Sequence, residues 1–533
     1  MRGGIQAWVK AQFGGDPPRA VLRQPAVWLF ALLVGIGVGY VAIAFFLALT
    51  FLERNLLGAL PGLMAERPWW VYLALPTGGG LVTGLALVRL LPDRRPPGIP
   101  DLIEARAVGD GRMAVGPALL GGALAILSLG SGASAGREGP IAHLGGALGS
   151  GLARALHLPP ELTRTLLGAG VAAAVSASFN APIAGVLFAL EVVLRHYALR
   201  AFGPIVIASA AAAVVSRVHL GPYPAFVMPP MHLVSNGEYG AVFVLGLVAA
   251  VVAIAFVQLV KTFESLAARL DPPLWLRPAA AGLLVGLIAL ACPQVLGVGY
   301  GTADAVLRDQ VALGALVGIL AAKIVATAVT LTGRFASGVF SPSLLIGACV
   351  GAIFGHVLAA FAPAEVSSPS FYAVVGMGAV AAAVLGAPIS TALIAFELTR
   401  DYETALALLI AVSVASVLAR SVLGHSIFLW QLERRGIDVR EGFHRTHLQR
   451  VRVYDFMRPP PDGEARALAE DEPHLARTDT LGRALALLDE GKLDNVPVVG
   501  HGETARVVGI VSYMDALRAY NRALVEADIE EHR

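Results

Sequence analysis

Charged side chains are scarce in this sequence. Aspartate, glutamate, lysine and arginine make up 15% of its 533 residues, against about 25% in a typical soluble domain. The scarcity is uneven, because 34 of these 78 side chains lie in the last 103 residues, from Gln431 to Arg533, and 44 are left for the first 430. A soluble fold of 430 residues needs more charge than that to cover its surface. We therefore expect lipid around the first 430 residues and water around the C-terminal region.

Cysteine and basic runs are scarce too. The two cysteines, Cys292 and Cys349, can build neither a disulfide framework nor a zinc site. A net charge of +2 without a basic run argues against a nucleic-acid partner.

The N-terminal residues are not those of a secretory signal. Residues 1–24 are mixed in polarity, and the apolar run from Ala26 to Phe51 is long enough to span a bilayer. Four basic residues precede this run, which predicts a cytoplasmic N-terminus: Arg2, Lys10, Arg19 and Arg23.

Further apolar segments follow, and their lengths are irregular. Several are too short to cross a bilayer, and others carry a turn signal in the middle. The turn signals are the segments 136–140 (GREGP), 180–182 (NAP), 338–342 (GVFSP) and 386–388 (GAP). Non-helical backbone survives at membrane depth only where it is buried in protein or lines a wet cavity, so broken helices predict a transporter or channel.

The turn signals recur in the same order. Residues 180–191 (NAPIAGVLFALE) match 386–397 (GAPISTALIAFE) at an offset of 206, and 136–140 match 338–342 at an offset of 202. We interpret the two pairs as two halves of one duplicated unit, whose interrupted helices mark a binding site near the bilayer midplane.

Three of the breaks predict helix starts with exposed backbone. In 136–140, 338–342 and 97–100 (PGIP), glycine precedes a proline, and proline suits the first turn of a helix. Unpaired N–H groups at a helix start form an anion site. Such a site binds weakly enough to release its ion, as conduction requires.

Glu138 lies in the first of these starts. A carboxylate there stabilises the helix dipole by only about 0.3–1 kcal/mol, whereas a charge at membrane depth usually marks function. We favour a gate: Glu138 competes with the permeating anion for the same amides and leaves when it is protonated.

These segments resemble the signature segments of the CLC family of chloride channels and transporters. The resemblance runs from about residue 25 to 436. It implies an all-α membrane domain of two inverted repeats of tilted and broken helices, and a homodimer with one anion pore per subunit. It also implies that Glu138 is the external gate and that the anion lies near Pro97, Gly98, Ile99, Arg137, Gly139, Val339, Phe340 and Phe428.

Three departures from the family pattern concern the ion. Many members have a serine hydroxyl where this chain has Pro97, and proline there resembles nitrate-preferring members, so we expect nitrate to permeate at least as well as chloride. Members that exchange protons commonly carry a second glutamate where this chain has Val192, the internal proton-site position. Phe428 replaces a tyrosine. We therefore expect a channel with weak or absent proton coupling, and the alternative is a proton/anion antiporter.

Two further membrane residues have open interpretations. Glu191, followed by Val192, is expected to be a structural carboxylate near a helix end, together with its repeat mate Glu397. Lys323 either snorkels or faces a cavity, or it makes the pore vestibule positive.

The C-terminal region has mixed polarity. An amphipathic helix (479–489), two short strands (495–499 and 506–511) and a second helix (513–520) resemble a CBS motif. We expect a linker at 437–450 and a small α/β cytoplasmic domain at 451–533, with one CBS motif at about 478–521 and room for only a remnant of another before it. Contact between two tails is the simpler expectation for this domain than adenine-nucleotide binding, and we expect no cofactor.

A different class of function is a membrane-embedded enzyme that uses Glu138, Glu191 and Glu397 as acids or bases. The sequence offers no nucleophile, metal cluster or convergent set of polar residues to support it, so we expect no enzyme activity.

Overall fold

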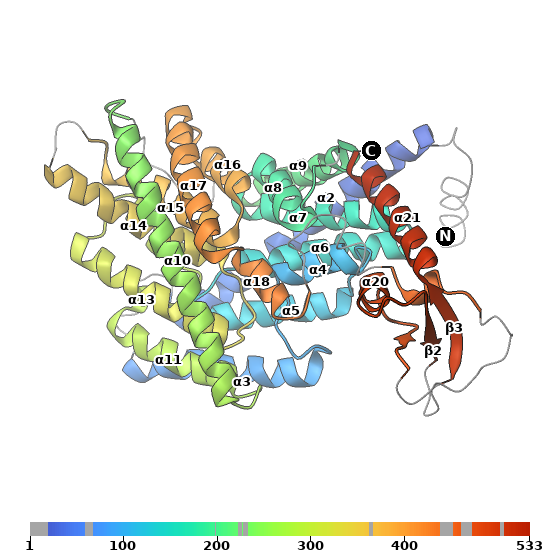
Figure 1. Cartoon of the computed structure of the whole chain (residues 1–533). Helices are drawn as coiled ribbons and strands as arrows, with labels where there is room; N and C mark the ends of the chain where they lie inside the picture. Colours follow the sequence, from blue (N-terminus) through green and yellow to red (C-terminus); the bar gives the residue numbers. More distant parts are fainter. Residues whose placement is uncertain are drawn as a thin grey trace. The chain divides into compact units, whose positions relative to one another are not determined.

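The computed structural model describes residues 20–58, 68–197, 199–221, 226, 233–361, 366–437, 451–459, 472–500 and 506–532 (Figure 1). Most of the expected N-terminal segment (1–24) and of the expected linker (437–450) lies outside these residues. The chain divides into two compact units, essentially the region up to Trp430 and the region from Gln431.

The elements of the first unit, in its described residues, are helices joined by turns and loops. Its α-helices, in chain order, are α2 (Ala20–Leu52), α3 (Trp69–Leu90), α4 (Ile99–Val108), α5 (Val115–Gly130), α6 (Glu138–Ala155), α7 (Pro160–Phe179), α8 (Pro182–Phe188), α9 (Leu199–Leu220), α10 (Glu238–Leu270), α11 (Arg277–Ala291), α12 (Tyr300–Leu307), α13 (Leu313–Thr332), α14 (Phe340–Phe361), α15 (Pro369–Leu385), α16 (Pro388–Thr399), α17 (Tyr402–Leu423) and α18 (Ile427–Glu433). Short π- or 3₁₀-helical turns follow α2, α8 and α11: η2 (Glu53–Leu57), η4 (Ala189–Leu194) and η5 (Pro293–Val295).

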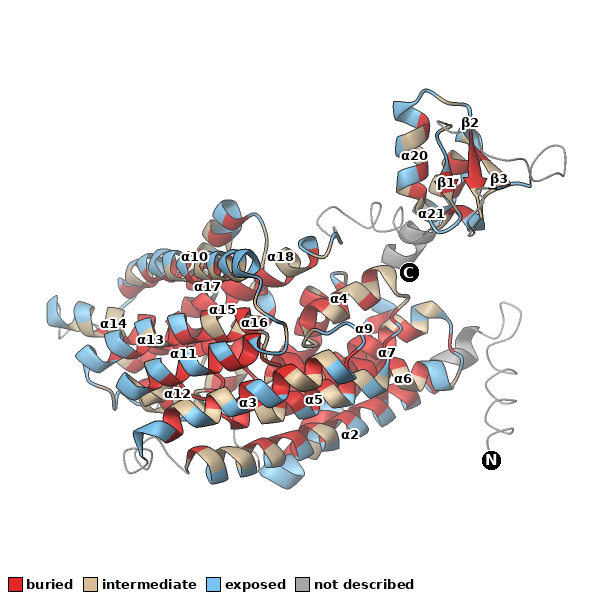
Figure 2. Ribbon diagram, turned by 90° about the horizontal axis from the view of Figure 1, so that it is seen from below, coloured by how far each residue is buried: buried red, intermediate tan, exposed pale blue. Residues whose placement is uncertain are grey.

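Eight helices of the described region are long and apolar enough to cross a membrane, and five shorter apolar helices accompany them. Buried residues concentrate on the inner helices. Of the eight candidate spans α7 is the most enclosed, with 83% of its most apolar window buried, whereas that of α10 is 44% buried (Figure 2). Large apolar side chains such as Val244 and Val251 point outward from α10. This distribution suits a chain surrounded by lipid.

The predicted breaks occur where the sequence placed them. α7 ends at Phe179, Asn180 takes a left-handed conformation with φ of 55°, and Pro182 begins α8. In the second half α15 ends before Gly386, which has φ of 68°, and α16 begins at Pro388. The helical run is therefore interrupted before Pro182 and before Pro388, because a proline cannot continue a helix and disfavours helical geometry in the residue before it.

The two halves hold each other through exchanged carboxylates. Glu191 accepts the amides of Ile389 and Ser390 at the start of α16, at 3.0 and 2.8 Å. Glu397 accepts the amides of Ile183 and Ala184 at the start of α8, at 3.1 and 2.7 Å. A contact that repeats with its two partners exchanged is the mark of a two-fold relation. The structural role expected of both glutamates is confirmed, as is the duplication.

Glycines let the helices of each half approach closely. A Cβ atom on Gly170 of α7 would lie 2.0 Å from the carbonyl oxygen of Gly145 in α6, and one on Gly376 of α15 would lie 2.5 Å from that of Gly347 in α14. No side chain fits at such distances, so any larger residue there would push these helices apart.

The second unit is a small α/β fold. A three-stranded sheet of β1 (Leu475–Ala476), β2 (Asn495–Val499) and β3 (Val507–Ser512) is packed with α20 (Leu481–Glu490) and α21 (Tyr513–His532). β1 runs parallel to β2, and β3 runs antiparallel to it. The expected elements are present, although α21 extends twelve residues beyond the predicted end and β1 is too short to be foreseen.

Residues 451–459 belong to this same unit. Val453 lies in its core, and Arg458 pairs with Ile510 of β3 through two backbone hydrogen bonds of 2.9 Å. These residues therefore pack with the predicted motif, and residues 460–471, the rest of the expected remnant, lie outside the described residues.

An ion pair joins Arg458, which is bridged to β3, to Asp515 in the first turn of α21. Burial raises the pKa of Asp515, but hydrogen bonds from Ser512 and Arg458, with the Arg458 charge, outweigh burial and hold the pKa below its usual value. The stability that the carboxylate contributes is present above its unfolded-state pKa and is lost as the pH falls through the lowered folded-state value.

The exchanged carboxylates generate a stability prediction. Glu397→Gln keeps the size of the side chain but replaces one acceptor oxygen by an NH₂ group, so one of the two amides at the start of α8 loses its partner. We expect a loss of about 1–3 kcal/mol, measured as a lower thermal midpoint of the detergent-solubilised protein. The control is Glu403→Gln, an exposed carboxylate in the first turn of α17. Equal midpoints for the two variants would contradict the structural role.

Candidate functional site

Two of the predicted helix starts meet directly. The residues before α6 and α14 form a two-bond antiparallel bridge, in which the Gly136 amide donates to the Gly338 carbonyl and the Gly338 amide to the Gly136 carbonyl, each at 2.7 Å. Gly139 lies against the same bridge, because a Cβ atom on it would be 3.3 Å from the Gly338 Cα atom. The first N–H groups of a helix have no acceptor within the helix, so this buried junction has the character of an anion site.

Glu138 occupies this junction, and its side chain is only 3% exposed. Its Oε2 atom accepts the Ser341 backbone amide at 3.3 Å and the Ser341 hydroxyl at 2.5 Å. Its Oε1 atom accepts the Tyr300 hydroxyl at 2.8 Å. The carboxylate thus fills donors that belong to the first turn of α14.

Arg137 lies beside this carboxylate in a stack of flat groups. Its Nε atom is 3.8 Å from Glu138 Oε1. Its guanidinium carbon lies 4.3 Å from the ring centroid of Phe46 and 4.3 Å from that of Tyr300. Such cation–π contacts stabilise the positive charge of Arg137.

Val339 and Phe340 are buried at the start of α14. The Phe340 ring packs against Phe179, with centroids 5.1 Å apart, and against Phe188, at 5.9 Å. These contacts place the end of α7 and the short helix α8 beside the junction, on an apolar side.

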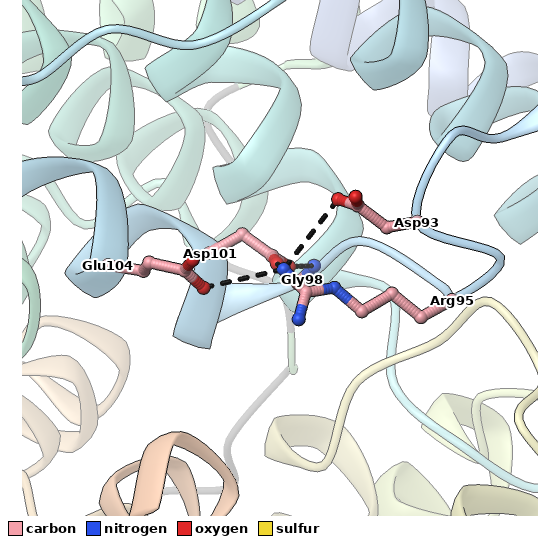
Figure 3. Close-up of polar contacts among 5 residues, drawn as sticks. All are labelled: Asp93, Arg95, Gly98, Asp101 and Glu104. Atoms are coloured by element: carbon pink, nitrogen blue, oxygen red, sulfur yellow. Dashed lines mark hydrogen bonds and ion pairs between the residues drawn. The ribbon is translucent and has the colours of Figure 1, made fainter. Parts of the chain in front are cut away.

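The third predicted start, at α4, has a different environment. The Gly98 amide donates to Asp101 Oδ2 at 2.6 Å, and Arg95 reaches Asp93, Asp101 and Glu104 at 3.7, 3.2 and 3.4 Å (Figure 3). An anion near Gly98 must therefore share this amide with a carboxylate of the same helix.

The described contacts join α4 to α5 and α6. The Pro97 ring packs on Gly121 of α5, and Leu102 packs on Gly146 of α6. Ile99 is buried at the first residue of α4. α6 and α14 thus meet at the Gly136–Gly338 bridge, and an anion contact at α4 stays a prediction.

Two further predicted positions are buried and apolar. Val192 lies in the π-helical turn η4, one residue after Glu191, whose carboxylate is engaged with the start of α16. Phe428 is buried in α18.

Lys323 is fully buried in α13, so it does not snorkel. Its ammonium donates to the carbonyls of Val295 and Gly297 at 3.0 and 3.2 Å. This charge fixes the loop that leads to Tyr300.

Sequence reasoning missed Tyr300 and Ser341. Ser341 lies within the segment 338–342, but no pattern in the sequence distinguishes its hydroxyl. Tyr300 follows Gly299, which has φ of 87° and precedes α12. Gly299 lies 201 residues after Gly98, which precedes α4 in the first half. The duplication could therefore have indicated a helix start at Tyr300, although not the direction of its hydroxyl.

Comparison with known proteins agrees with this geometry. The sequence matches the family described as voltage gated chloride channel over residues 78–420 and the CBS domain over residues 453–522. It is 35% identical over 416 residues to a ClcB-like chloride channel protein of Ralstonia nicotianae, which covers 76% of this chain and 96% of the relative. It is 30% identical over 412 residues to the voltage-gated ClC-type chloride channel ClcB of Citrobacter koseri, which covers 75% and 97% of the two chains.

Among solved structures, the crystal structure of a slow cyanobacterial Cl⁻/H⁺ antiporter has a TM-score of 0.70 at 25% identity, over 77% of this chain and 97% of that one. The relatives, the matched profile and the junction of helix starts all lead to one assignment: this chain belongs to the voltage-gated chloride channel family and carries a CBS domain in its C-terminal region.

Proposed function

We propose that this chain is a channel for chloride and nitrate, gated by Glu138, with weak or absent proton coupling. Anion transport by an integral, multi-pass membrane protein follows from the family. The observation that carries the finer proposal is the contact of Glu138 with Ser341, because a carboxylate there occupies donors that an anion would need.

The gate works by competition between two anions. An ionised carboxylate and a dehydrated halide both favour the N–H and O–H groups at the start of α14, since hydrogen bonds to ionised acceptors are about twice as strong as neutral ones. Protonation removes the charge of Glu138 and, with it, most of this advantage. The neutral side chain then leaves, and the anion takes the donors of Ser341 and the neighbouring amides.

Weak proton coupling is supported by three side chains that can neither carry a proton nor donate a hydrogen bond. Val192 cannot carry a proton to the gate from the inside. Pro97 has neither a hydroxyl nor an N–H group, and Phe428 has no hydroxyl. An anion held by fewer donors is held less firmly, which favours passage over exchange.

The second candidate is a proton/anion antiporter. It is favoured by the 25% identity to a protein named as a Cl⁻/H⁺ antiporter and by Glu138 itself, which can carry a proton. Arg195, His196 or water offers a detour for protons around Val192.

The proposed assembly is a homodimer with one anion pathway per subunit and both termini in the cytoplasm. The basic residues before α2 support this orientation through the positive-inside rule. Contact between two C-terminal units is the simplest role for the CBS domain.

Replacing the gate tests the mechanism. In liposomes, Glu138→Gln is expected to conduct at neutral pH at the level that the wild type reaches only in acid, because an amide cannot ionise. The anion efflux, recorded from pH 4 to 8 and at several voltages, should lose most of its pH dependence. Glu403→Gln serves as the control and should keep the wild-type profile. A Glu138→Gln protein with wild-type pH and voltage dependence would refute the gate.

Proton movement decides between the two candidates. Efflux of chloride from liposomes should proceed with little proton uptake when potassium and valinomycin clamp the voltage, and a proton ionophore should not change its rate. A fixed ratio of protons to anions, measured with a pH electrode beside a chloride electrode, would establish the antiporter in place of the channel.

The ion preference depends on Pro97. Nitrate is expected to permeate at least as well as chloride, and Pro97→Ser is expected to shift the chloride-to-nitrate ratio toward chloride by about fivefold, the factor given by one hydrogen bond of about 1 kcal/mol. The ratio is measured by anion replacement in the same liposomes. Pro96→Ser, one residue earlier, should leave it unchanged, and a wild type with strong chloride preference would contradict the interpretation.

A further inference from the structure

Tyr300 holds the gate from a different element than Ser341 does. Its hydroxyl donates to Glu138 Oε1 at 2.8 Å, while Ser341 donates to Oε2. Tyr300 begins α12, and Ser341 belongs to the first turn of α14. The two carboxylate oxygens are therefore held by two helix starts, and the gate leaves only when both contacts break.

The Tyr300 ring is fixed by a stack of flat groups, which we call the aromatic stack: Phe46, Arg137, Tyr300 and Phe226. The rings of Phe226 and Tyr300 are stacked, with centroids 4.8 Å apart and planes 6° apart. The Arg137 guanidinium lies 4.3 Å from both Tyr300 and Phe46. The hydroxyl is thus presented to Glu138 by a ring that is held by α2, by the residue before α6 and by the segment between α9 and α10.

The charges around the carboxylate belong to several elements. Arg137 is 3.8 Å from Glu138. Beyond it, Glu53 in η2 interacts electrostatically with both Arg137 and Lys323. Lys323 of α13 is bonded to the carbonyls of Val295 and Gly297, three to five residues before Tyr300. Positive charge therefore faces the gate from the α6 side, and the loop that carries Tyr300 is tied down by a buried lysine.

We infer that Tyr300 is a latch for the gate: its hydroxyl, presented by the aromatic stack, holds ionised Glu138 on the α14 start and sets the pH at which the pathway opens. This inference rests on the proposed gating role of Glu138. The reason is that a phenol O–H donates readily to a carboxylate but gains less from the neutral acid, so the contact favours the ionised, closed state. Tyr300 acts through Glu138 and is a positioning residue.

The test is Tyr300→Phe, which removes the hydroxyl and keeps the ring in the stack. We expect the pH of half-maximal anion efflux to rise by about one unit, a tenfold shift of the protonation equilibrium, and efflux at neutral pH to increase. In a Glu138→Gln background the same change should have no effect on the pH profile, because the acceptor that titrates is gone. Phe226→Leu loosens the stack and should shift the profile in the same direction by less, which keeps the test open if Tyr300→Phe does not fold.

A matched control comes from a second tyrosine–glutamate pair. Tyr372 of α15 is also buried and donates to Glu238 Oε2 at 2.5 Å. Glu238 also accepts the amides of Val234, Ser235 and Ser367, so its role is to join two loops. Tyr372→Phe should lower the thermal midpoint and leave the half-maximal pH unchanged.

The outcomes separate the latch from the gate. A folded Tyr300→Phe protein with the wild-type pH profile overturns the latch, and so does a shift that persists at full size in the Glu138→Gln background. If either of these results occurs while Glu138→Gln loses its pH dependence, the latch is refuted but the gating role of Glu138 is supported. If Glu138→Gln itself keeps the wild-type profile, the gate fails, and the latch fails with it.

Discussion

Two peptide hydrogen bonds, exchanged between Gly136 and Gly338, support the rest of this site. They hold the starts of α6 and α14 against each other, so that the positive ends of two helix dipoles share one small buried volume. Such an arrangement needs a negative partner, because unpaired N–H groups are costly away from water. In the structure, the carboxylate of Glu138 is that partner. In the proposed mechanism, a permeating anion takes the place of this carboxylate.

Glutamates at membrane depth have two roles in this fold, and their donors distinguish the roles. Glu191 and Glu397 each accept two backbone amides of another helix start, so each is a permanent clamp between the halves. Glu238 accepts three amides and two hydroxyls. Glu138 accepts one amide and two hydroxyls. Hydroxyls can rotate to another acceptor, whereas peptide N–H groups cannot. Of these four carboxylates, Glu138 is therefore the one whose departure costs the protein least.

Much of the fold was predictable because its signals are local. Proline and glycine dictate where a helix starts or stops. The duplication of these signals indicates the two halves and shows that Glu191 and Glu397 hold equivalent positions in them. The hydrogen bond from the Gly98 amide to Asp101 could also have been predicted, since a carboxylate three residues into a helix start commonly accepts such an amide. The sequence could not predict the stacking of Phe46, Phe226 and Tyr300, because these residues come from three distant segments and their stacking depends on tertiary packing. The short strand β1 was missed because two residues carry no periodicity.

The proposed pathway combines a firm outer contact with weak inner ones. At the gate, three donors from two helix starts hold one carboxylate. At the inner positions the chain has Pro97 and Phe428, neither of which can donate through its side chain, and the Gly98 amide is engaged with Asp101. In coupled exchange, the anion must stay bound until the proton has moved, and the proton must stay bound until the anion has moved. This requires an inner site that retains its anion. An inner site with few donors does not retain the anion, so in this proposal the gate alone sets the rate of passage.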